Sequence, residues 1–92
     1  MISERLRDFL LSWCNPDTQP EEVAEMLCGR SGAYYADWLE GELLATARAG
    51  EFTPKSLERL TGLWFAGQPD VDAWLRRIWP MWFGRQYPGV SA

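Results

Sequence analysis

The sequence predicts an all-α protein, a compact bundle of four to five short helices. Apolar residues recur at intervals of three and four along most of the 92-residue chain, and this spacing places them on one face of a helix. No segment alternates apolar and polar residues between turn signals, as a half-buried strand does. The length suits one domain. We therefore expect a single helical domain over residues 1–84 and a flexible C-terminal tail over residues 85–92.

The two N-terminal helices are predicted from their start signals. Ser3 is a typical N-cap, and apolar residues follow it at helical spacing over about residues 3–14. Thr18 and Glu21 then resemble a capping box, in which the threonine oxygen and the glutamate satisfy backbone donors of the first turn. The second helix is expected over about residues 19–28.

The longest predicted helix covers about residues 32–49. Glu42 falls at the centre of its apolar face, and Leu44 falls on its polar face. A buried carboxylate is costly unless it is paired, so we expect Glu42 to form an ion pair or to reach the rim of the core. General acid–base duty is the alternative. The expected partner is one of four arginines, namely Arg48, Arg59, Arg76 or Arg77.

A further helix starts at Thr53 and Pro54, because threonine caps well and proline suits the first helical position. Trp64 is expected on its inner, apolar stripe. Gly62 lowers the stability of this helix without ending it. The segment 67–69 (Gly-Gln-Pro) ends it.

The aromatic stretch 70–84 (DVDAWLRRIWPMWFG) is the predicted centre of the core and holds three of the six tryptophans. Its apolar arc covers about 200°, wider than the stripe of a one-sided surface helix. We expect Asp70 to cap this helix and Pro80 to kink or restart it. The width of the arc favours a core helix. The alternative is an exposed interface formed by Trp79, Trp82 and Phe83.

The charge of the chain is unevenly distributed. The formal net charge is −4, yet residues 17–42 carry seven acids and one base, whereas residues 48–92 carry six bases and four acids. An acidic half repels nucleic acids and anionic membranes and attracts basic protein surfaces. An ordinary solvated surface is the alternative. We expect a basic protein partner and no direct binding to nucleic acid or to a membrane.

The sequence offers little for catalysis. It contains no histidine, the usual base for activating a nucleophile and a common zinc ligand. Cys14 and Cys28 fit no zinc spacing and have no evident activating partner. The N-terminus has no apolar signal region. We expect a cytoplasmic protein with two free, buried thiols, no cofactor, no metal site and no enzymatic activity.

In size, acidity and helical content the chain is similar to the small all-helical bacterial immunity proteins that neutralise nuclease toxins or contact-dependent inhibition toxins. The similarity extends over the whole chain and rests on no motif, so it assigns no residue a role. It implies an inhibitor that blocks a basic toxin or nuclease. One alternative is a phage-type inhibitor of a nucleic-acid-binding defence complex. Another is a structural or adaptor subunit that oligomerises through the aromatic helix.

The residues expected to bind the partner lie in the acidic segment, and one exposed apolar residue accompanies them. A monomer in solution favours the inhibitor, and a salt-insensitive homodimer favours the adaptor subunit. The expected contact residues are Glu21, Glu22, Glu25, Asp37, Glu40 and Leu44.

Overall fold

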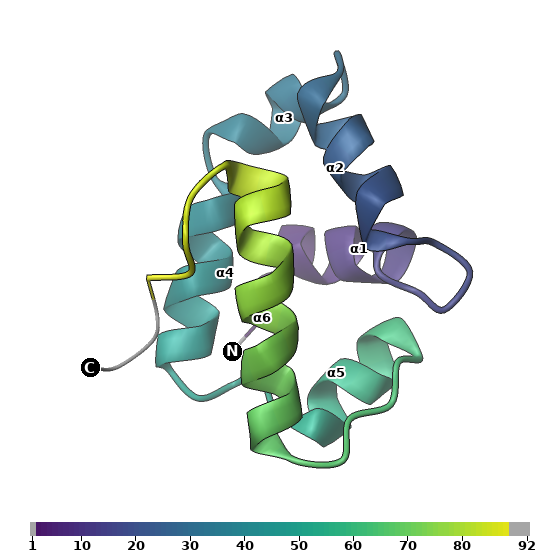
Figure 1. Ribbon diagram of the computed structural model, residues 1–92, viewed down its shortest axis with the longest axis vertical. Coiled ribbons are helices and arrows are strands. Elements are labelled where there is room, and N and C mark those ends of the chain that lie inside the picture. The colour runs from purple at the N-terminus through teal and green to yellow at the C-terminus, as the bar shows by residue number, and fades with distance from the viewer. Residues whose placement is uncertain (1, 89–92) are drawn as a thin grey trace.

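The computed structural model describes residues 2–88, and this part of the chain is all-α, as predicted, with six helices and no strand. The helices are α1 (Glu4–Trp13), α2 (Pro20–Cys28), α3 (Gly32–Ala36), α4 (Leu39–Arg48), α5 (Pro54–Thr61) and α6 (Gln68–Phe83). Figure 1 shows α6 at the centre, with α4 on one side, α5 near its N-terminal end and α2 near its C-terminal end. The aromatic helix therefore organises the fold.

The hydrophobic core is built around α6, as the width of its apolar arc predicts. Trp79 is fully buried and Trp82 is 6% exposed, so the expected interface is wrong for both tryptophans, which have almost no surface left for a partner. Phe83 is partly buried against the same core. The buried residues of α6 are Val71, Trp74, Leu75, Ile78, Trp79 and Trp82.

Two expectations about α6, the cap at Asp70 and a restart at Pro80, are wrong. Gly67 occupies the N-cap position, whereas the Asp70 carboxylate accepts a hydrogen bond from the backbone N–H of Ala66 at 3.0 Å. The helix also continues through Pro80 to Phe83 without a new start. Pro80 is exposed, so water can satisfy the carbonyl that loses its backbone donor.

The helix expected over residues 32–49 is instead two helices, because the backbone leaves the helical conformation at Trp38 (φ −138°, ψ −27°). The Trp38 side chain is buried. Its ring centroid lies 5.6 Å from that of Tyr35, and the Arg5 guanidinium lies 4.5 Å from the Trp38 ring. Burial of a large aromatic ring outweighs a local helix preference.

Gly62 ends α5, contrary to the expectation that the helix would pass through it. Its φ of +74° lies in the left-handed region, which glycine adopts without steric cost and which commonly closes a helix. Trp64 therefore lies outside the helix and is 74% exposed. Its predicted place on the inner stripe is wrong.

Two of the four expected N-caps are confirmed, those at Ser3 and Thr53. The Ser3 hydroxyl accepts the backbone N–H three residues later at 3.2 Å, and the Thr53 hydroxyl accepts the equivalent N–H at 3.1 Å. The capping box expected at Thr18 is wrong. The N-cap position of α2 belongs to Gln19, and no side-chain cap hydrogen bond forms there.

The first part of the expected C-terminal tail is held against the core. The Tyr87 ring centroid lies 4.9 Å from that of Trp79, and Arg85 Nε lies 3.2 Å from a carboxylate oxygen of Glu40. The segment 89–92, which completes the expected tail, lies outside the described residues.

Candidate functional site

A surface groove lies between the loop that joins α1 to α2 and the loop that joins α5 to α6, with α6 as its inner wall. Its cavity measures about 250 Å³. We name it the aromatic groove, because four of the six tryptophans and one phenylalanine line it. These residues are Trp13, Trp64, Phe65, Trp74 and Trp82.

The two loops that form the groove approach each other at Gly62. A Cβ atom at this position would lie 3.3 Å from Pro16 Cδ, so the absence of a side chain permits the approach. Thr61 fixes the turn, because its hydroxyl donates to the Leu57 carbonyl at 2.7 Å and accepts the Leu63 N–H at 3.0 Å. The chain is thereby directed from the end of α5 toward α6.

The inner wall of the groove is fixed by edge-to-face ring contacts. Phe65 and Trp74 have centroids 5.9 Å apart at 71°, and Trp74 and Trp82 have centroids 6.2 Å apart at 86°. Such pairs are favourable beyond the area that they bury. The Trp82 indole N–H also donates to the Pro20 carbonyl at 3.0 Å. The wall is therefore preorganised.

Trp64 forms the exposed rim of the groove. At 74% exposure it is the most exposed large apolar side chain of the described residues. Tryptophan is enriched among residues that dominate binding energy at protein interfaces, so Trp64 makes the groove a candidate binding site. The other exposed large apolar residues are Leu11, Tyr34 and Met81.

Cys14 also lines the groove, but it is no nucleophile. Its side chain is 5% exposed, and desolvation by burial raises the pKa of Cys14 to about 12. The thiol therefore stays protonated at neutral pH. Cys28 is exposed, so the expectation of two buried thiols holds for Cys14 and is wrong for Cys28.

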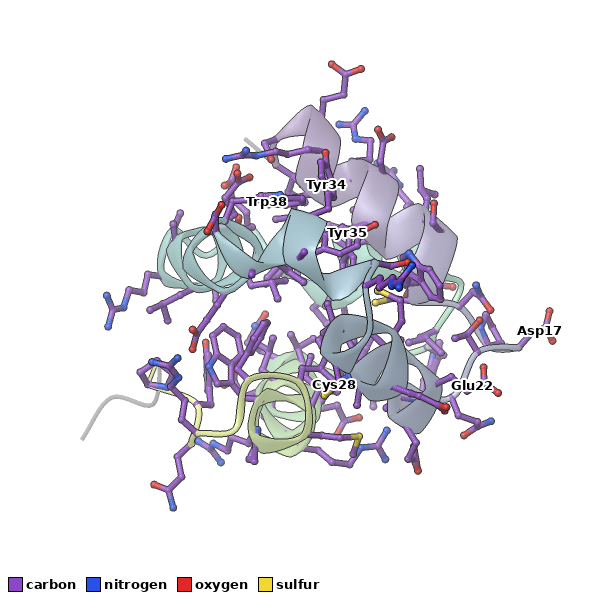
Figure 2. All side chains as sticks on the ribbon, turned by 90° about the horizontal axis from the view of Figure 1, so that it is seen from above. Asp17, Glu22, Cys28, Tyr34, Tyr35 and Trp38 are labelled. Carbon is purple, nitrogen blue, oxygen red and sulfur yellow. The ribbon has the colours of Figure 1, made fainter. Side chains whose placement is uncertain are left out.

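Segment 14–29, which contains α2 and one side of the groove, carries only acidic charges. Residues 14–29 contain four acids and no base, and all four acidic side chains are exposed. Figure 2 shows Asp17 and Glu22 on the same side of the molecule, away from Tyr34 and Trp38. We name these four acids the α2 acidic patch. They are Asp17, Glu21, Glu22 and Glu25.

Arg77 is the one charged side chain that lines the groove in the described part of the chain. It is exposed and forms no ion pair with any residue from 2 to 88. Its guanidinium donors are therefore available to a ligand.

Two of the seven acids of residues 17–42 form hydrogen bonds and ion pairs within the chain. Glu40 accepts a hydrogen bond from the Trp79 indole N–H at 2.9 Å and also pairs with Arg85. Glu42 accepts hydrogen bonds from the Ser3 hydroxyl and from Arg5 Nε. The seven acids of residues 17–42 are therefore not equally available to a partner, because Glu40 and Glu42 are paired within the chain.

The Glu42 prediction is partly confirmed. Its side chain is 23% exposed, so it does reach the rim of the core as an ion pair. The partner is Arg5, not one of the four later arginines. Among the other expected contact residues, Asp37 is exposed. Leu44 is partly buried against the core, so its expected exposure is wrong.

No family model, curated protein or solved structure matches the chain. None of the helices in residues 2–88 is long and apolar enough to cross a membrane. The two neighbouring surface features that suit a binding partner are the aromatic groove and the α2 acidic patch.

Proposed function

We propose that this chain is a small protein-binding inhibitor, of the immunity-protein type, that captures a basic toxin or nuclease. The observation that carries the proposal is the α2 acidic patch. Its four acids are exposed and lie in a run of 16 residues that contains no base. The aromatic groove lies directly beside it, since residues on both sides of Asp17 line the groove. Charge and apolar anchors therefore occupy one surface.

The two features contribute to different stages of binding. The negative charges of the α2 acidic patch attract a basic surface over about 8 Å at physiological ionic strength. Such electrostatic steering raises association rates. Desolvated aromatic anchors mainly slow dissociation. Tight capture of a toxin requires both.

The adaptor alternative has less support. It requires Trp79 and Trp82 on an oligomer interface, and both are buried within a single copy of the chain. The exposed Trp64 belongs to the groove instead. We therefore expect a monomer in solution, with light scattering after size exclusion as the measurement.

Affinity capture from the native host tests the proposal. The immobilised wild-type chain is compared with the triple variant Glu21→Lys, Glu22→Lys, Glu25→Lys. A matched triple variant with the same net charge changes three exposed acids elsewhere. They are Glu4, Asp8 and Glu58.

The proposal expects a basic protein that the wild type and the matched variant retain and the α2 variant loses. Circular dichroism checks that both variants remain helical. Equal retention by all three proteins contradicts the proposal, and so does equal loss from both variants, because net charge alone would then explain binding.

A further inference from the structure

We infer that the aromatic groove binds an extended, proline-rich segment of the partner that carries a basic residue. This inference rests on the proposed function, because it names the part of the partner that the groove holds. It depends on the size of the groove, the chemistry of its lining and the charge beside it.

The size of the groove suits a short peptide segment. Its cavity of about 250 Å³ lies below the range of about 300–1,000 Å³ typical of sites for small molecules and cofactors. It is also open at the surface, with Trp64 standing at its rim. A few side chains of a passing chain therefore fit it better than an enclosed ligand.

The lining suits one common way of binding peptides and lacks the groups that two others require. Strand addition needs a free sheet edge, and residues 2–88 form no strand. Recognition of phosphate needs a cluster of arginines, and the described lining contains only Arg77. Proline-rich segments dock between aromatic side chains, which is the lining that Trp13, Trp64 and Trp74 provide.

The polar groups of the groove match the backbone of such a segment. A polyproline II chain makes no internal hydrogen bonds, so its carbonyl groups accept from a partner. Arg77 offers unpaired guanidinium donors in the groove wall, and Gln19 offers a side-chain amide. In such a complex Arg77 donates hydrogen bonds to carbonyl oxygens of the segment, which gives this positive side chain a role beside the acidic patch.

The α2 acidic patch accounts for the basic residue. Asp17 lies in the loop that lines the groove, and Glu22 lies in the first turn of α2. A lysine or arginine next to the prolines would meet these carboxylates at the rim. The ring wall of the groove and a polyproline II segment are both ordered before binding, which lowers the entropic cost of association.

Titration calorimetry on the full chain tests the inference. The probe is a synthetic proline-rich peptide with one arginine at its end. A control peptide has every proline replaced by alanine, and a second replaces the arginine by glutamine. The protein variants are Trp64→Ala and Tyr34→Ala, which truncate exposed aromatic side chains inside and outside the groove.

We expect the proline peptide to bind and the alanine peptide not to bind. Trp64→Ala should weaken binding at least about tenfold, and Tyr34→Ala should leave it unchanged. Asp17→Asn should weaken binding of the arginine peptide more than that of the glutamine peptide. Because Trp64 is exposed, its truncation should not alter folding, and Trp64→Leu provides a second variant that keeps apolar surface.

Three results would overturn the inference. They are no binding of the proline peptide to the wild type, equal loss of affinity in Trp64→Ala and Tyr34→Ala, and equally strong binding of the alanine peptide. The last result would indicate that the groove binds a helix. Retention of a basic partner by the wild type would still support the proposed function in each case. Conversely, peptide binding without any effect of the α2 charge reversal on capture would refute only the proposed function.

Discussion

The close approach of α2 and α3 predicts that Gly32→Ala destabilises the protein. A Cβ atom at Gly32 would overlap the backbone carbonyl of Leu27. A backbone carbonyl cannot move away by a rotamer change, as the end of a flexible side chain can. The distance between α2 and α3 at this junction must therefore increase. Overpacking of this kind costs about 1–3 kcal/mol.

The magnitude follows from two opposing terms. Replacing a helical glycine by alanine gains about 0.5–1 kcal/mol, and the middle of this range set against the middle of the overpacking range gives a net loss of about 1 kcal/mol. For a domain of this length that corresponds to a melting temperature about 4–8 °C lower. Gly41 provides the matched control, because it is exposed within α4 and a Cβ there would meet no atom within 4 Å beyond its chain neighbours and the adjacent backbone of its own helix. Gly41→Ala should therefore stabilise by about 0.5–1 kcal/mol.

Urea unfolding followed by tryptophan fluorescence measures both effects. An unchanged slope with denaturant would show that only stability differs. The reasoning predicts opposite shifts of the two midpoints. A stabilised Gly32→Ala variant would refute it, because α2 and α3 would then not approach as described.

Three further predictions follow from the side chains. Glu42→Gln removes a partly exposed ion pair and should lower the unfolding free energy by about 0.5–1 kcal/mol in urea, whereas exposed Glu58→Gln should change it by less than about 0.5 kcal/mol. In the folded protein a thiol reagent should modify exposed Cys28 and leave buried Cys14 unmodified. The rate of Cys14 modification should equal the rate expected from global unfolding. Because burial raises the Cys14 pKa to about 12, the unfolded thiol ionises first. The stability contributed by this group is present below about pH 9 and is lost as pH rises toward about 12, measurable by comparing wild type with Cys14→Ala.

The helical fold was predictable from local signals, whereas several boundaries were not. Ser3 and Thr53 carry their capping information within three residues, and the apolar period identifies the buried face of α6. Trp38 interrupts a helical pattern because its ring gains burial in the tertiary structure. Gly62 did offer a local signal, since a glycine after several helical turns commonly forms a left-handed cap.

The candidate site was harder to predict because it is assembled from distant segments. The aromatic groove joins residues near 13–20 with residues near 63–65 and α6. The fate of the acids was equally non-local, because Glu42 meets a residue 37 positions away and Glu40 meets one 39 positions away. Charge counting along the chain cannot distinguish these paired carboxylates from the free ones on α2.

The central claim is that the α2 acidic patch and the aromatic groove form one binding face. Amide hydrogen exchange of the full chain, with and without the basic protein captured from the host, tests it most directly. Binding across this face should slow exchange in residues 15–28 and 62–66 and leave α3 little changed. Protection confined to α3 and the start of α4, with both of those segments unaffected, would contradict it.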